Sequence, residues 1–223
     1  MTDAAEAPPL VYIVDDDEAL RDSLRWLIRS VDLEVEDHPS ADSFLRAFSE
    51  ERPCCILLDV RMPGLSGMDL QAVLRERGAE APILFMTGHG DVPMAVRALK
   101  AGAFDFVEKP FDDAVMLDHI HAALDRHRAI LHERGKRAVL LERWDTLTPR
   151  ETQVMRKVAE GLQNKVIAHE LDISLKTVEV HRHNVMEKMA AASVADLTRM
   201  LLILDGSAAG SPSPLHPGMR SQT

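Results

Sequence analysis

The sequence predicts a doubly wound α/β domain with a five-stranded parallel sheet, followed by an all-α domain of four helices. The first observation is that short apolar runs alternate with helix-like stretches through the N-terminal half. The second is that only helical patterns follow Trp144. The third is charge. Residues 1–130 carry 25 Asp and Glu against 13 Lys and Arg, a net charge of −12, whereas residues 131–223 carry 11 against 13, a net charge of +2. Because only the second part would tolerate phosphate, two domains with different partners are expected.

Five short runs are the predicted strands of the sheet. Most are apolar on both faces, as expected for parallel strands covered by helices on each side. They are 10–14 (LVYIV), 33–37 (LEVED), 54–58 (CCILL), 83–87 (ILFMT) and 104–108 (FDFVE). In such a sheet the working site lies at the carboxyl ends of the strands.

Helical periodicity predicts the segments between these strands. They are 18–30, 40–50, 66–78 and 91–102, with Ser40 and Ser66 as N-caps and Gly78 and Gly102 as C-terminal stops. A further helix is expected over 112–139, interrupted only at Gly135, with its His119, His121 and His127 at a surface or an interface. The chain as a whole is expected to consist of an α/β domain at 8–127, a helical linker at 128–144, an all-α domain at 145–205 and a disordered tail at 206–223.

Composition excludes several classes of protein. No apolar run approaches the roughly 18 residues of a membrane span, so no membrane partner is expected. The acidic segment 1–9 lacks the basic start of a secretory signal, and the adjacent Cys54 and Cys55 cannot crosslink distant segments. These features indicate a cytoplasmic protein.

Polar side chains follow four of the predicted strands. Asp15 and Asp16 follow the first, Asp59 follows the third, Thr87 ends the fourth and Lys109 follows the fifth. Because the ends of parallel strands share one edge, these groups are expected to converge. Clustered carboxylates favour Mg²⁺, and a carboxylate can act as the nucleophile toward a phosphoryl group. Taken alone, the three consecutive acids at 15–17 could also form a solvated loop that caps the next helix.

The motifs VYIVDDDEALRDSL, CCILLDVRMPGLSGMDL and ILFMTGHGDVPMAVRALKAGAFDFVEKPF resemble the receiver domain of two-component response regulators, which has a flavodoxin-like fold. The resemblance implies Asp59 as the phospho-acceptor and a partner histidine kinase as the donor. It also implies that Asp15, Asp16, Asp59 and the carbonyl of Arg61 hold Mg²⁺. Thr87 and Phe106 would be the switch residues, and Lys109 would pair with the phosphate. The peptide bond before Pro110 would be cis.

The C-terminal helices have local signals of their own. Thr148, with Pro149 after it and Glu151 three residues on, forms a predicted capping box. Ser174 is expected to cap a longer helix that follows a short helix and a tight turn, an arrangement typical of a helix-turn-helix. Residues 148–205 carry 8 acidic and 8 basic residues, so the charge alone leaves a protein-binding helical domain open.

Residues 145–204 resemble the LuxR-type helix-turn-helix of the FixJ/NarL family, through LTPRE, GLQNKVIA and SLKTVEVHRHNVMEKM. The resemblance implies binding of double-stranded DNA. The implied contacts are Glu179, Val180 and His183 in the major groove, with Lys176, Thr177, Arg182, Lys188, Asn164 and Lys165 near phosphates.

Together the two resemblances imply a transcription factor, not an enzyme, that forms a homodimer when phosphorylated. One alternative is a pseudo-receiver that binds DNA constitutively. A second is a Mg²⁺-dependent phosphohydrolase that uses Asp59, although Arg61 stands where that class would place a second carboxylate. A protein-only adaptor is a third.

Overall fold

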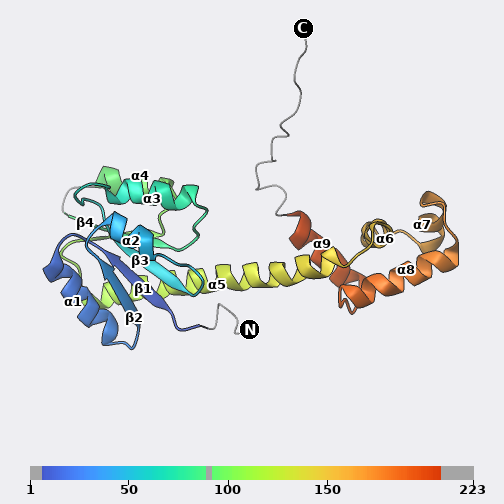
Figure 1. Cartoon of the computed structure of the whole chain (residues 1–223), viewed down its shortest axis with the longest axis horizontal. Coiled ribbons are helices and arrows are strands. Elements are labelled where there is room, and N and C mark those ends of the chain that lie inside the picture. Colours follow the sequence, from blue (N-terminus) through green and yellow to red (C-terminus); the bar gives the residue numbers. More distant parts are fainter. Residues whose placement is uncertain (1–6, 89–91, 207–223) are drawn as a thin grey trace, which may run out of the picture. The chain divides into compact units, whose positions relative to one another are not determined.

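The computed structural model describes residues 7–88 and 92–206, without the side chains of residues 92, 93 and 95. These residues divide into two compact units, Met1–Gly135 and Lys136–Thr223 (Figure 1). The domain boundaries expected from the sequence stay predictions. Apart from Gly206, the expected tail at 206–223 lies outside the described residues.

The N-terminal unit is built on a five-stranded sheet in the order β2-β1-β3-β4-β5, and all four neighbouring pairs are parallel. The strands are β1 (Leu10–Val14), β2 (Glu34–His38), β3 (Cys54–Asp59), β4 (Ile83–Thr87) and β5 (Asp105–Glu108). The predicted doubly wound sheet is therefore confirmed. Strand β2 begins one residue later than predicted, because the pairing with β1 starts at Glu34, which lies opposite Leu10, the first residue of β1.

Helices cover both faces of this sheet. They are α1 (Glu18–Arg29), α2 (Ala41–Ala47), α3 (Gly67–Glu76), α4 (Val92–Lys100) and the first part of α5 (Asp113–Asp145). Alternate strand residues face opposite ways, so Val11 and Ile13 pack with α1 and α5, whereas Tyr12 and Val14 pack with α2 and α3. Cys54 and Cys55 are buried free cysteines on opposite faces.

The predicted caps are present in the structure. Ser40 and Ser66 cap α2 and α3 through side-chain oxygens that accept backbone N–H groups. Gly78 and Gly102 follow α3 and α4 with φ of 74° and 97°, the left-handed region that glycine favours.

Two expectations for α5 differ from the structure. The helix continues through Gly135 without a break, because one glycine costs a helix only about 1 kcal/mol. His127 is fully buried, and its Nδ1 accepts the backbone N–H of Cys54 at 2.9 Å. The surface position expected for His127 was therefore wrong. The ring lies on the inner face of α5, where it supplies the acceptor that the buried N–H of Cys54, at the start of β3, needs.

The C-terminal unit contains α6 (Pro149–Ala159), α7 (Asn164–Glu170), α8 (Leu175–Lys188) and α9 (Val194–Asp205). One core joins all four helices, with Val154, Ile167, Val178 and Leu197 each fully buried. The capping box of Thr148 and Glu151 is present in full. None of the helices in the described part of the chain has the length and apolar character that a membrane span requires.

Candidate functional site

The carboxyl ends of four strands meet at one edge of the sheet. Asp15 follows β1, Asp59 ends β3, Thr87 ends β4 and Lys109 follows β5. Backbone bonds hold the loops in place beyond the strands: Val60 N–H donates to the Met86 carbonyl at 3.2 Å, and Lys109 N–H donates to the Thr87 carbonyl at 2.7 Å. The peptide bond between Lys109 and Pro110 is cis, as the resemblance implied.

Lys109 bridges two buried carboxylates in this pocket. Its Nζ lies 2.7 Å from Asp15 Oδ2 and 2.6 Å from Asp59 Oδ1. Asp15 is 1% exposed and Asp59 is 9% exposed. Burial raises the pKa of Asp59 above its usual value and outweighs the opposing hydrogen bond from Lys109. Although burial lowers the pKa of Lys109, its bonds to both carboxylates raise that pKa overall. Asp59 is therefore a carboxylate held close to a permanent cation.

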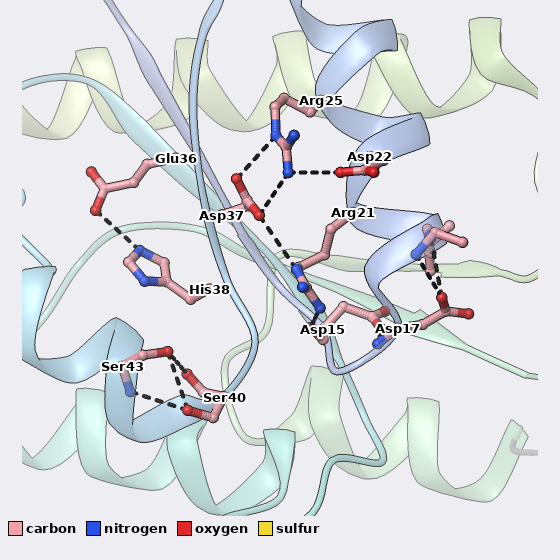
Figure 2. A network of polar contacts seen from close by, with 12 residues as sticks. Asp15, Asp17, Arg21, Asp22, Arg25, Glu36, Asp37, His38, Ser40 and Ser43 are labelled. Carbon is pink, nitrogen blue, oxygen red and sulfur yellow. Dashed lines mark hydrogen bonds and ion pairs between the residues drawn. The ribbon is translucent and has the colours of Figure 1, made fainter.

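The acidic loop after β1 places its three carboxylates differently. The Asp15 Oδ1 accepts the N–H of Asp17 at 2.9 Å. Asp17 caps α1 by accepting the N–H groups of Ala19 and Leu20 (Figure 2). Asp16 is exposed and lines a cavity of about 670 Å³. Of the three acids, Asp17 thus caps α1, Asp15 bonds Lys109 in the pocket, and Asp16 lines the cavity.

The donor set of this pocket suits a hard divalent cation. Two carboxylates share one ammonium, and Asp16 adds further negative charge at the rim of the cavity. The Asp59 Oδ2 accepts the N–H of Arg61 at 2.7 Å, which brings the Arg61 backbone beside the Asp59 carboxylate. Within the residues that the structure describes, no three His, Cys, Asp or Glu side chains are grouped in a metal-binding arrangement. Carboxylate and carbonyl oxygens are nevertheless the ligand types that Mg²⁺ prefers, and in this structure Lys109 is the cation that joins Asp15 and Asp59.

Thr87 and Phe106 lie on neighbouring strands, Thr87 as the last residue of β4 and Phe106 as the second residue of β5. Thr87 is buried, and its hydroxyl donates to the Gly88 carbonyl at 3.3 Å. Phe106 pairs in register with Phe85 of β4 and packs, half-buried, against the core on the side of α3 and α4.

Gly67 is a residue of this site that the sequence did not single out. It begins α3, and its N–H donates to the Val60 carbonyl at 3.2 Å. A Cβ built on Gly67 would overlap the carbonyl oxygen of Asp59 and contact the Phe85 ring. The absence of a side chain therefore lets α3 approach the backbone of Asp59. No local pattern signals this approach, because it depends on a contact between two separate elements.

Gly67→Ala is expected to cost about 1–3 kcal/mol in the free energy of unfolding, because the added methyl group must displace either α3 or the Asp59 loop. Urea unfolding of the full chain measures the loss. Gly135→Ala is the matched control, because its Cβ would contact nothing within 4 Å and its position is helical. An unchanged unfolding midpoint for Gly67→Ala would contradict the close approach.

The candidate DNA-binding residues gather on α7 and α8 of the C-terminal unit. Val178, Val185 and Met189 turn into the core, so the other side of α8 is left for solvent. Among the predicted contacts, the exposed ones are Lys165, Lys176, Glu179, Val180 and His183. Val166 and Leu175, which the sequence did not single out, are also exposed, at 41% and 49%.

Three of the remaining predicted contacts make side-chain bonds within the unit. Arg182 Nη1 donates to Asn164 Oδ1 at 2.8 Å, which joins the start of α7 to the middle of α8. The Thr177 hydroxyl lies 2.7 Å from that of Ser174, the N-cap of α8.

Lys188 has a different role from the one predicted. Its Nζ lies 2.6 Å from Glu151 Oε2 and 3.0 Å from the Thr146 carbonyl. Glu151 is 3% exposed. Lys188 therefore neutralises a buried carboxylate at the start of α6, and this placement argues against the predicted phosphate contact.

Comparison with known proteins identifies both units. Residues 11–121 match the family model "Response regulator receiver domain", and residues 145–201 match "Bacterial regulatory proteins, luxR family". The chain is 46% identical to the transcriptional regulatory protein FixJ of Azorhizobium caulinodans, over 92% of this chain and 97% of that protein.

Solved structures show the same relationship. The response regulator StyR aligns with a TM-score of 0.80 and 44% identity, over 87% of this chain and 98% of that one. Full-length FixJ from B. japonicum aligns with a TM-score of 0.54 and 42% identity, over 88% and 97% of the two chains. These matches show that this chain belongs to the FixJ-type response regulators, in which a receiver domain precedes a LuxR-type DNA-binding domain.

Proposed function

We propose that a partner histidine kinase phosphorylates this response regulator on Asp59 in a Mg²⁺-dependent reaction, and that the phosphorylated chain dimerises and binds DNA to regulate transcription. The observation that carries the proposal is the bridge of Lys109 between two buried carboxylates at the carboxyl edge of the sheet. We further propose that the protein acts in the cytoplasm, where such a kinase would meet both this chain and DNA.

The acceptor chemistry follows from the position of Asp59. Its carboxylate oxygen attacks the phosphorus of the donor, the bond from phosphorus to the kinase histidine nitrogen breaks, and the electron pair stays on that nitrogen. The carboxylates of Asp15, Asp16 and Asp59 and the carbonyl of Arg61 would hold Mg²⁺, which when bound offsets the negative charge of the transferring oxygens. The cavity that Asp16 lines is also lined by Val60 and Arg61, the two residues that follow Asp59, so we propose that the donor approaches from this side.

The switch uses groups that already lie next to the acceptor. Once Asp59 carries a phosphoryl group, the Lys109 ammonium pairs with it, and the Thr87 hydroxyl leaves the Gly88 carbonyl to donate to a phosphoryl oxygen. Phe106, half-buried on the neighbouring strand two residues before the level of Thr87, moves into the space that Thr87 vacates. The altered face of α4 and β5 then favours the dimer.

The DNA contacts belong to the exposed side of α8. Glu179, Val180 and His183 would enter the major groove, where Glu179 can accept from cytosine and Val180 can contact a thymine methyl group. Lys176, Thr177, Arg182, Asn164 and Lys165 would lie near phosphates. Lys188 is left out of this set because it pairs with Glu151.

The test is to incubate the full chain with Mg²⁺ and a small-molecule phosphodonor, and to measure its mass, its oligomeric state and its affinity for DNA. One added phosphate, a dimer and tighter DNA binding are expected together. Tight DNA binding without any phosphate would favour the pseudo-receiver instead. Release of many phosphates per chain would favour the phosphohydrolase, and failure to bind any duplex would favour the protein-only adaptor.

Lys165→Ala and Lys176→Ala are each expected to weaken binding to a duplex selected with the wild-type protein. Each removes one exposed cation from the proposed phosphate-facing surface, so the slope of log affinity against log salt concentration should fall in magnitude by about 1. Fluorescence anisotropy across a salt series measures that slope. Arg29→Ala, which removes an exposed cation at the end of α1, is the control and should leave the slope unchanged. An unaltered slope in both test variants would place the phosphate contacts elsewhere.

A further inference from the structure

A buried arginine lies directly behind the acidic loop of the acceptor pocket. Arg21 is on the first turns of α1 and is only 9% exposed. Its Nη1 donates to the main-chain carbonyl of Asp15 at 2.8 Å (Figure 2). This bond is buried and charge-assisted, so it is among the stronger kinds of hydrogen bond in proteins.

Asp37 at the edge strand holds the guanidinium of Arg21 in place. Its Oδ2 lies 3.3 Å from Arg21 Nε. Arg25, one helical turn further along α1, also bonds both carboxylate oxygens of Asp37, each at 3.0 Å, and pairs with Asp22 (Figure 2). Burial raises the pKa of Asp37, but the two arginines more than offset it and lower that pKa overall, so the carboxylate is ionised at neutral pH. The group thus joins α1 to the end of β2.

All the polar groups of Asp15 are fixed from different sides. Its N–H donates to the His38 carbonyl of β2, and its carbonyl accepts from Arg21. Its Oδ1 accepts the Asp17 N–H, and its Oδ2 faces Lys109. Because Lys109 also bonds Asp59, the orientation of Asp15 bears directly on the acceptor.

We propose that Arg21, held by Asp37, is a positioning residue that sets the backbone of Asp15 and thereby the carboxylate that serves the Mg²⁺ and phosphoryl site. Arg21 itself touches none of the reacting atoms. The pair also keeps the charge behind the pocket balanced, because Asp37 neutralises the guanidinium that would otherwise repel a divalent cation. The inference rests on the proposed function and adds Arg21 and Asp37 as the residues that preorganise the Asp15 carboxylate.

The experiment compares Arg21→Met, Asp37→Asn and Arg25→Met in the full chain, first without metal or phosphodonor. The amide proton of Asp17 donates to the Asp15 carboxylate, so its NMR shift reports the orientation of that carboxylate. Arg21→Met is expected to move this resonance strongly and Asp37→Asn to move it in the same direction by less. Arg25→Met is the matched control, because Arg25 bonds Asp37 but not Asp15, and it should leave the resonance in place.

Titration with Mg²⁺ alone is the second readout. Loss of an outer residue that orients a metal ligand typically weakens metal affinity by about 10–100-fold, and an effect near the lower end is expected for Arg21→Met. Arg25→Met should stay within about twofold of the wild type. Should Arg21→Met fail to fold, Asp37→Asn carries the test, because this variant keeps the Arg21 side chain but removes the charged partner that holds its guanidinium.

The outcomes separate this inference from the proposed function. A folded Arg21→Met protein with an unmoved Asp17 resonance and unchanged Mg²⁺ affinity would overturn the positioning role, even if wild-type Asp59 accepts phosphate. A shifted resonance with weakened Mg²⁺ binding would support the role, even if no donor phosphorylates the protein. Equal effects of Arg25→Met and Arg21→Met would also overturn it, because they would reflect general disturbance of α1.

Discussion

Asp59→Asn is expected to abolish the gain of phosphate from a phosphodonor and, with it, the phosphorylation-dependent dimer. An amide nitrogen or oxygen cannot replace the attacking carboxylate oxygen, and no other carboxylate in the pocket has the place of Asp59 at the end of β3. Intact-protein mass and sedimentation velocity, measured with Mg²⁺ and the donor present, check both losses.

Loss of stability would not explain this result. The pKa of Asp59 is raised by burial, so its ionised form lowers the stability of the folded protein at neutral pH. Removal of that charge also leaves Lys109 and Asp15 as a balanced pair. The unfolding midpoint of Asp59→Asn should therefore equal or exceed that of the wild type. Asp42→Asn, an exposed change on α2, is the control and should gain phosphate normally. Phosphate on the Asp59→Asn protein would show that another residue is the acceptor.

Lys188→Met is expected to destabilise the C-terminal unit by about 2–4 kcal/mol, because it leaves the carboxylate of Glu151 buried without its cation. The Lys188 side chain is 34% exposed, so the loss should lie toward the lower part of the range for fully buried pairs. Trp144 packs against the core of this unit and Arg156 lies over its ring, so its fluorescence follows unfolding there. A Trp26→Phe background leaves Trp144 as the only tryptophan.

A double variant tests whether the loss comes from the unpaired charge. Glu151→Gln combined with Lys188→Met removes both charges and keeps an acceptor for the Thr148 N–H, so it should recover more than half of the loss. Failure to recover would mean that Lys188 stabilises the unit mainly through its methylene groups and its bond to Thr146.

The same pair predicts a pH dependence. Although burial raises the pKa of Glu151, hydrogen bonds from Lys188 and Thr148 lower it to about 2, from an ordinary value of 4.5. A carboxylate with a depressed pKa stabilises the fold above its unfolded pKa, and that contribution is lost as the pH falls from about 4.5 toward 2. The stability advantage of the wild type over the double variant should shrink across this window.

Local signals in the sequence determined the helices and strands and the polar residues that meet at the carboxyl edge of the sheet. Short runs that are apolar on both faces specify buried parallel strands, and the residue after each strand must lie at the shared carboxyl edge. Asp15, Asp59, Thr87 and Lys109 could therefore be grouped from the sequence alone. Caps such as Ser40 and Ser66 were equally predictable, because each capping side chain bonds the backbone only three residues away.

Only the tertiary structure decided which side chains meet across elements. Lys109 reaches Asp15 and Asp59 from 94 and 50 residues away, and Lys188 reaches Glu151 from 37 residues away. The packing of α1 against β2 brings Arg21 to the Asp15 carbonyl, and the approach of α3 to the Asp59 backbone requires Gly67. Periodicity fixes which face of a helix or strand a residue occupies. It leaves open the partner on the opposing element, because that depends on how the elements pack and on the rotamers that this packing allows.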